Sequence, residues 1–276
     1  MIERIVAPDG TSLAYRVVGS GPRPVVLVHS LALDGSWFEP LAAELGDTFS
    51  CVIPDLRGHG ASGGAPDSIS LDVLADDIAL IAEQLGLTRY PVVGISLGGM
   101  VAQALAHRHP DAVEAGVLIA TAGAYDDNAR AGSRSRADAA RAPGGLAALA
   151  DMTMTRWFGD PQRPDPLITR ARDQFLGGDP AIHAAFLEAM TAVGDFDVPP
   201  SVPTLVIGGT DDVSTPRTVI ENLHARIPHS RLRFAPGGHL AAFTHPVPVA
   251  ALLREFLDSP EPSPPHNDTS KDARVV

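Results

Sequence analysis

The stretch Val92-Val93-Gly94-Ile95-Ser96-Leu97-Gly98 contains a Gly-x-Ser-x-Gly pattern with Ser96 at its centre. The residues before Ser96 form a short apolar run, as a buried strand does, and Met100, Ala104 and Leu105 recur after it with helical spacing. Ser96 is therefore expected at a sharp turn from strand to helix, where the flanking glycines relieve the clash between closely approaching backbones. A serine held in this way points into a cleft, and the N-terminal end of the following helix favours an oxyanion there. We predict that Ser96 is a nucleophile.

Short β-branched runs alternate with helical patterns over most of the chain, which is typical of a parallel sheet covered by helices. The runs cover residues 25–28, 51–53, 92–95, 116–119, 204–207 and 232–234. Because each run is short and apolar, all six are predicted to be buried central strands. One helical pattern between them has Ser70 as its expected N-cap and Gly86 as its expected end. The sequence thus predicts an α/β fold with a mostly parallel sheet flanked by helices.

The pattern changes between residues 124 and 197, where β-runs vanish and helical spacing dominates. We interpret this segment as an inserted helical cap, and residues 1–123 and 198–258 as the core. Residues 259–276 are rich in proline and then polar, so they are expected to form a disordered tail. One cap helix is expected to line one side with Leu146, Leu149, Met152, Met154 and Trp157.

Composition limits the classes of partner and the compartment. The 276 residues include 21 Lys and Arg against 33 Asp and Glu, and the formal net charge of −12 argues against a nucleic-acid binder. The single cysteine, Cys51, excludes an intramolecular disulfide framework. Neither a secretory signal nor a run of ~20 apolar residues is visible. We therefore expect a globular cytoplasmic protein that binds neither nucleic acid nor membranes.

A serine nucleophile needs a base near neutral pH, and His239 is the candidate. It follows the predicted strand 232–234 in a glycine turn, at the end of the sheet where Ser96 is expected. The other histidines, His183 among them, are expected on helical or surface patterns. We therefore predict His239 as the general base.

The base in turn needs an orienting acid, and Asp211 and Asp212 follow the predicted strand 204–207. We favour Asp212, which lies three residues after Gly209, and keep Asp211 as the alternative. In the same loop Thr215 is expected to cap a helix that Pro216 opens. Serine, aspartate and histidine then follow one another in the chain order of an α/β-hydrolase.

An oxyanion hole needs two backbone N–H groups. One is predicted at Leu97, the residue after the nucleophile, and the other at Leu31, in the loop after the strand 25–28. His29 in that loop, and Arg57 and His59 in the loop after the strand 51–53, are expected to be structural.

Several motifs together resemble the α/β-hydrolase superfamily over nearly all of residues 1–258. They are His29-Ser30-Leu31, Asp55-Leu56-Arg57-Gly58-His59-Gly60, Gly94-Ile95-Ser96-Leu97-Gly98-Gly99-Met100, Gly209-Thr210-Asp211-Asp212 and Gly238-His239. More narrowly, the first of these, with Gly98-Gly99-Met100-Val101-Ala102-Gln103, Gly145-Leu146-Ala147-Ala148-Leu149 and Arg156-Trp157-Phe158, resembles 3-oxoadipate enol-lactonases. The resemblance implies an α/β-hydrolase fold, a serine triad and hydrolysis of a small enol-lactone without metal or organic cofactor.

Substrate contacts are expected from the cap. A carboxylate-bearing substrate would need a cation in this acidic protein, and Arg156 is assigned to it, with Trp157 as a wall of the pocket. Further candidates for the cation are Arg130, Arg134, Arg136 and Arg141. The chain departs from the family at His245, where an acidic residue often precedes the proline.

These observations predict a hydrolase that cleaves a small ester or lactone through an acyl-enzyme. The same triad would also suit a cofactor-free haloperoxidase or perhydrolase, or a hydrolase of carbon–carbon bonds. A ligand receptor on the same scaffold is the non-enzyme alternative.

Overall fold

A computed structural model describes residues 1–160 and 162–259 of the chain. Within these residues, eight strands form one sheet in the order β1-β2-β4-β3-β5-β6-β7-β8. The strands are β1 (Ile2–Val6), β2 (Ser12–Val18), β3 (Arg23–Val28), β4 (Phe49–Pro54), β5 (Tyr90–Ile95), β6 (Val113–Ile119), β7 (Thr204–Gly209) and β8 (Ser230–Ala235). From β4 to β8 all neighbours are parallel, whereas β2 is antiparallel to both β1 and β4. The predicted α/β fold with a mostly parallel sheet is confirmed.

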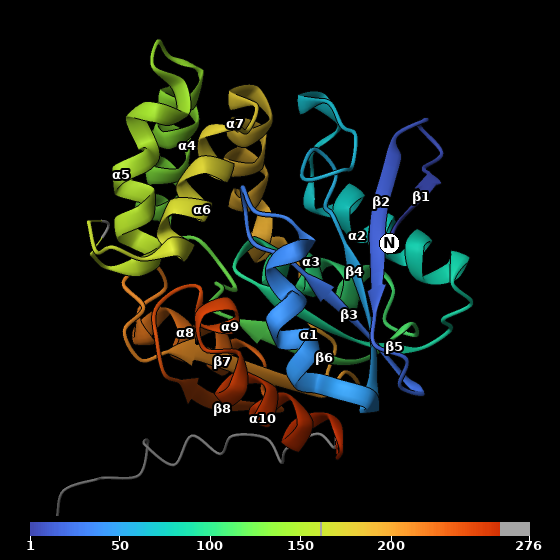
Figure 1. Ribbon diagram of the computed structural model, residues 1–276. Coiled ribbons are helices and arrows are strands. Elements are labelled where there is room, and N and C mark those ends of the chain that lie inside the picture. Colours follow the sequence, from blue (N-terminus) through green and yellow to red (C-terminus); the bar gives the residue numbers. More distant parts are fainter. Residues whose placement is uncertain (161, 260–276) are drawn as a thin grey trace, which may run out of the picture.

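Helices cover both faces of this sheet. The helices that pack on it are α1 (Glu39–Leu45), α2 (Leu71–Gln84), α3 (Leu97–Arg108), α8 (Arg217–Arg226), α9 (Ala241–Thr244) and α10 (Pro246–Leu257). Figure 1 shows α1 and α10, which pack against each other, in front of the sheet, with α2 and α3 behind it. Short 3₁₀ helices form at η1 (Gly35–Phe38), η2 (Gly46–Thr48), η3 (Pro66–Ser68) and η4 (Met190–Asp195). Since β3, β5 and β6 run between these layers, their fully buried side chains are apolar.

The prediction of six buried central strands is correct for five runs and wrong for residues 232–234. Those residues belong to β8, which is the last strand of the sheet and, within residues 1–160 and 162–259, pairs only with β7. Leu232 and Phe234 are half-buried and Arg233 is exposed, because an edge strand is covered on fewer sides. The hairpin of β1 and β2 was not predicted, and the largely exposed side chains of β1 explain why its apolar signal is weak.

The helix after residue 70 forms as the sequence indicates. The Ser70 hydroxyl accepts the N–H of Val73 at the start of α2, and Gly86, just after the end of the helix, has a left-handed φ of +72°. Cys51 is buried and reduced in the core.

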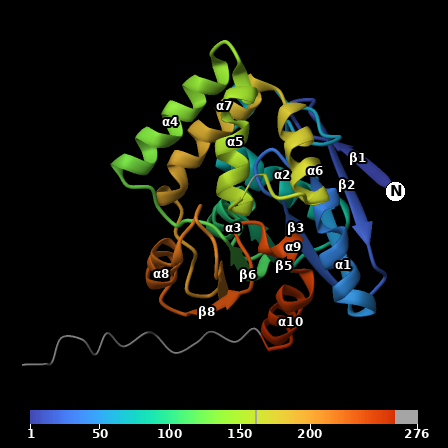
Figure 2. The same ribbon diagram turned by 60° about the vertical axis from the view of Figure 1, so that its left-hand side comes forward.

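Four further helices lie between β6 and β7 in the chain, and we refer to them as the cap helices. They are α4 (Asp127–Arg141), α5 (Gly145–Phe158), α6 (Pro166–Leu176) and α7 (Pro180–Ala189). Figures 1 and 2 show them gathered together beyond one end of the strands. In α5 the prediction for Met152 is wrong: it is 42% exposed, because it lies outside the stripe on which Leu146, Leu149, Met154 and Trp157 are buried.

Two expectations can be compared with the structure only over the described residues. The predicted tail 259–276 lies outside them except for Ser259. Among the residues that are described, no helix combines the length and the apolar character that crossing a bilayer requires.

The backbone is tightly packed at the turn between β5 and α3. A Cβ atom added to Gly98 would lie 2.0 Å from the carbonyl oxygen of Val28 in β3, and one added to Gly94 would lie 2.0 Å from that of Gly98. Neither position can hold a larger residue unless the backbone moves. The two glycines therefore let α3 start directly against β3 and β5.

Replacing Gly98 by alanine is expected to lower the free energy of unfolding by about 3 kcal/mol or more, since the new methyl group overlaps backbone atoms. Urea unfolding followed by circular dichroism measures the change. The matched control is Gly132→Ala in α4, where an added Cβ has no atom within 4 Å. That variant should be neutral or more stable by about 0.5–1 kcal/mol. Equal midpoints for Gly98→Ala and the parent chain would contradict the crowding argument.

Candidate active site

Ser96 stands between β5 and α3 in a strained conformation. Its φ of +54° is left-handed, although it is not a glycine. The surrounding structure enforces this conformation: the Ser96 N–H donates to the carbonyl of Ile119, and the Thr121 hydroxyl donates to the carbonyl of Ser96. The side chain is consequently fixed at the carboxyl end of the sheet, where it lines a cavity.

His239 lies within hydrogen-bonding distance of Ser96 at the same end of the sheet. It follows β8 in a turn in which Gly237 has a φ of +104°. Its Nε2 lies 2.9 Å from Ser96 Oγ, and its Nδ1 lies 3.0 Å from Asp212 Oδ2. All three side chains are more than nine-tenths buried, so their hydrogen bonds are shielded from bulk water. The structure thus brings together three of the residues that the sequence predicted.

The Asp212 carboxylate is held by several donors besides the imidazole. Its Oδ1 accepts the N–H groups of Ser214 and Thr215, and its Oδ2 accepts the Thr215 hydroxyl. Burial raises the pKa of Asp212, but the hydrogen bonds from His239 and Thr215 outweigh it, so the net shift of the pKa is downward. The carboxylate therefore stays charged beside the imidazole at neutral pH.

The loop separates the two candidate acids as the sequence analysis favoured, but its helix start differs from the prediction. Asp211 is exposed and accepts the hydroxyl of Thr210, so Asp212 and not Asp211 faces His239. Thr215 does not cap the following helix, because its hydroxyl is used by Asp212. Pro216 is the N-cap residue of α8, which begins at Arg217.

The two backbone groups predicted for the oxyanion hole lie on neighbouring elements. Leu97 is the first residue of α3, and Leu31 follows β3 and lines the same cavity as Ser96. Within the described residues, no acceptor takes the N–H of either leucine. Both donors are therefore available to a ligand, and the positive end of α3 adds to the potential at this point.

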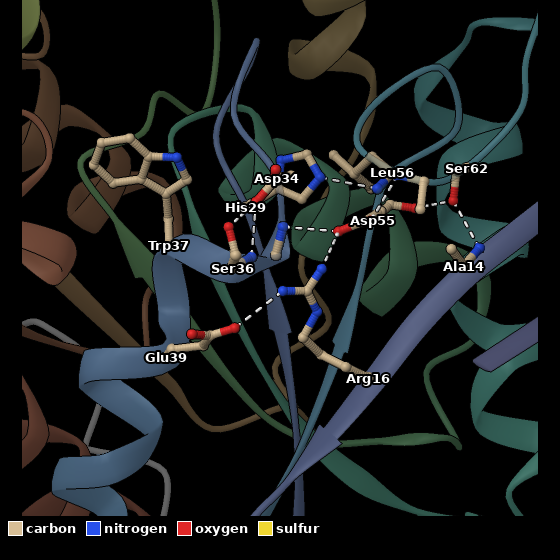
Figure 3. A network of polar contacts seen from close by, with 12 residues as sticks. Ala14, Arg16, His29, Asp34, Ser36, Trp37, Glu39, Asp55, Leu56 and Ser62 are labelled. Atoms are coloured by element: carbon tan, nitrogen blue, oxygen red, sulfur yellow. Dashed lines mark hydrogen bonds and ion pairs between the residues drawn. The ribbon is translucent and has the colours of Figure 1, made fainter. Parts of the chain in front are cut away.

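The loop that contains Leu31 is anchored by a buried carboxylate beneath it. Asp55, after β4, accepts the Gly35 N–H through Oδ1 and the Ala61 N–H through Oδ2, each at 2.9 Å. Figure 3 shows Arg16 beside this carboxylate, at 3.6 Å, and His29 accepting the N–H of Leu56. These bonds join the loops after β3 and β4.

The three residues expected to be structural in these loops have structural partners. His29 binds Leu56, and His59 accepts the N–H of Ala32 at 2.9 Å. Burial lowers the pKa of both imidazoles, which are therefore neutral acceptors. Arg57 forms a two-point ion pair with Asp77 of α2.

One cap helix is tied directly to the loop after β3. The Gln174 amide of α6 accepts the Trp37 indole N–H at 2.7 Å and donates to Asp34 at 2.8 Å. Arg170, one turn earlier, stacks on the Trp37 ring with its guanidinium 4.1 Å from the ring centroid. The cap helices therefore have a fixed point of attachment beside the loop that contains Leu31.

The cavity between the cap helices and the sheet measures about 600 Å³. Ser96, His239 and Leu31 lie on the side of the sheet, and Arg156 and Trp157 of α5 line it from the cap, as predicted. Of the other arginine candidates, only Arg136 of α4 lines the cavity. Arg141 instead pairs with Glu188, and Arg130 donates to the carbonyl of Tyr125.

Tyr125 and His183 line the cavity, although sequence reasoning did not assign them to it. His183 of α7 is buried with its ring edge-on to Phe175, and burial and the charge of Arg136 lower its pKa to about 4. A histidine inside the apolar run from Ala181 to Leu187 was the available signal. Among the described residues, no group of three or more histidine, cysteine or acidic side chains could hold a metal ion.

Comparison with known proteins agrees with this fold. A family model described as "alpha/beta hydrolase fold" matches residues 23–142 and 124–246. The chain is 28% identical to 3-oxoadipate enol-lactonase 2 of Acinetobacter baylyi, over 92% of this chain and 97% of the relative.

Solved structures give the same result. A thermophilic esterase from Thermogutta terrifontis superposes with a TM-score of 0.84 at 31% identity, covering 94% of this chain and 99% of the esterase. An enol-lactonase from Burkholderia xenovorans superposes with a TM-score of 0.80 at 30% identity, covering 91% of this chain and 98% of the lactonase. The family match spans well over half of the residues, and the chain belongs to the α/β-hydrolase fold family, within which it resembles enol-lactonases.

Proposed function

We propose that this protein hydrolyses small esters or lactones, with Ser96 as nucleophile, His239 as general base and Asp212 as the orienting acid. The observation that carries this proposal is the continuous chain of hydrogen bonds from Ser96 through His239 to Asp212 at the wall of the cavity. A buried nucleophile, base and acid in this order are the parts that acyl transfer needs.

The reaction follows from this geometry. Ser96 Oγ attacks the carbonyl carbon of the substrate while its proton passes to His239 Nε2, 2.9 Å away. Asp212 accepts the Nδ1–H of the imidazole, which fixes the tautomer and stabilises the imidazolium that forms. The N–H groups of Leu31 and Leu97 bind the oxyanion of the tetrahedral intermediate.

In the second half of the reaction His239 acts first as a general acid and then again as a general base. His239 gives its proton to the leaving oxygen, and in a lactone this oxygen remains tethered to the acyl group. A water molecule then loses a proton to His239 and attacks the ester of Ser96, which releases the acid and restores the serine.

The choice of ester or lactone is supported by the relatives, which include an enol-lactonase and an esterase over nearly their whole lengths. We propose further that residues 124–197 act as a cap that selects the substrate. Trp157 would form an apolar wall and Arg156 a polar contact, since both line the cavity that contains Ser96.

Replacing Ser96 by alanine is expected to lower kcat for a p-nitrophenyl ester or a small lactone by at least about 10⁴-fold, because no other group can form the acyl-enzyme. The thermal unfolding midpoint should stay close to that of the parent. A fluorophosphonate should add its mass to the parent protein but not to this variant. The matched control is Ser135→Ala on the exposed face of α4, which should keep full activity. Undiminished turnover by Ser96→Ala would refute the assignment of the nucleophile.

Two substitutions, Asp212→Asn and Asp211→Asn, test which aspartate orients the imidazole of His239. Asparagine at 212 leaves the imidazole without a charged acceptor and should lower kcat by about 10³–10⁴-fold. Asparagine at 211 alters an exposed group that bonds Thr210 and should change kcat less than about threefold. Steady-state kinetics on one ester compares the two variants, and a larger loss at 211 would overturn the choice of Asp212.

A further inference from the structure

Among the described residues four histidines are buried: His29, His59, His183 and His239. In His29, His59 and His239, each ring nitrogen lies within hydrogen-bonding distance of another residue. At His183, by contrast, no hydrogen bond within the described part of the chain engages either nitrogen. Buried polar side chains normally have such a partner, so this imidazole needs an explanation.

The side chain of His183 opens on the cavity that contains Ser96. It is 7% exposed and lines this cavity from α7. Its unbonded nitrogens are not sealed inside the protein, as the unbonded hydroxyl of Tyr90 is. The ring packs edge-on against Phe175, with the centroids 5.1 Å apart, which limits how far it can turn. A ligand in the cavity can therefore reach a ring nitrogen of His183.

A structural role does not account for a histidine at this position. The neighbouring residues of α7, from Ala181 to Leu187, are apolar, and an unbonded polar group among them is unfavourable. An apolar residue in place of His183 would avoid this cost. A second base for Ser96 is not needed either, since His239 already bonds its hydroxyl. The position of the ring points instead to contact with a bound substrate.

The protonation state of His183 limits which group it can bind. Burial, together with the charge of Arg136, lowers its pKa to about 4, so the imidazole is neutral near pH 7. A neutral imidazole has one nitrogen that donates and one that accepts. A hydroxyl group suits whichever nitrogen faces the cavity, because it both donates and accepts, whereas a carbonyl oxygen only accepts.

The surroundings of the ring provide one polar point in an apolar stripe. Leu187 and Met190 follow His183 by four and seven residues, which places them on the same side of the chain, and both line the cavity. Neither offers a strong hydrogen-bonding group. The matching ligand has one neutral polar group on an otherwise apolar skeleton.

We propose that His183 is a specificity-determining residue that hydrogen-bonds a hydroxyl group of the substrate. The preferred substrates are then esters or lactones that carry a neutral hydroxyl apart from the reacting carbonyl. This inference rests on the proposed hydrolase function and names its substrate class. His183 takes no part in bond formation at Ser96, and it orients the substrate while Leu187 and Met190 contact the apolar part.

The test compares esters in which a methyl group of similar size replaces the hydroxyl. One pair carries the change in the acid: each enantiomer of methyl 3-hydroxybutanoate, and methyl 3-methylbutanoate. The other pair carries it in the alcohol: 2-hydroxyethyl butanoate and propyl butanoate. For at least one pair, the parent should hydrolyse the hydroxyl ester with a kcat/KM about tenfold or more above that of the methyl partner, the effect of one buried hydrogen bond.

Substitutions at His183 should remove this preference. His183→Phe keeps a flat ring without nitrogens, and in it kcat/KM should fall about tenfold for the preferred hydroxyl ester, through a higher KM, but not for the methyl partner. His183→Leu should behave in the same way, so a poor fit of the larger ring does not decide the result. His183→Gln, whose amide donates and accepts, should keep most of the preference. The control His107→Phe changes an exposed histidine of α3 and should alter neither value.

Two sets of outcomes keep this inference apart from the proposed chemistry. A parent that prefers neither hydroxyl ester, a preference that persists in His183→Phe and His183→Leu, or an equal loss for both members of a pair would overturn the role of His183. Labelling of Ser96 by a fluorophosphonate would then still support the hydrolase. Undiminished hydrolysis by Ser96→Ala would instead overturn the proposed function.

Discussion

The contact between three backbone segments at Gly94, Gly98 and Val28 is the constraint on which the site depends. The start of α3 lies in close contact with the ends of β3 and β5. We infer that this contact holds Ser96 in its left-handed φ. Val28 also ends β3 directly before the loop that carries Leu31. One close approach therefore sets both the direction of the Ser96 hydroxyl and the position of the neighbouring loop, and Asp55 secures that loop from below through Gly35.

Hydrogen bonds from backbone and side-chain groups hold the rest of the site in place. Asp212 is aligned by two backbone N–H groups and a hydroxyl, so its position does not depend on the imidazole it faces. The cap joins the same framework through Gln174, which bridges Trp37 and Asp34. Ser96 and His239 thus stand after the ends of strands, whereas Arg136, Arg156 and Trp157 line the cavity from the helices laid over the sheet.

The sequence predicted what local patterns encode. The Gly-x-Ser-x-Gly turn, the central strands and the order of Ser96, Asp212 and His239 all follow from short motifs, and the structure brings these side chains together. Adjacent residues such as Asp211 and Asp212 could not be separated with certainty, since their directions depend on hydrogen bonds within the loop. Tyr125 and His183 were not assigned to the cavity, because the docking of the cap helices on the sheet brings them there and periodicity does not describe that docking.

The outermost position of β8 bears on how the protein would lose activity. This strand pairs only with β7 and is half-buried, yet the turn after it supplies His239. Strands at a sheet margin open locally at a smaller free-energy cost than the whole domain requires. The imidazole would then leave Ser96 while the central strands are still paired. Mild heating or dilute denaturant should thus abolish activity before the ellipticity changes. The edge of the sheet and not its interior then sets the temperature or denaturant concentration at which activity is lost.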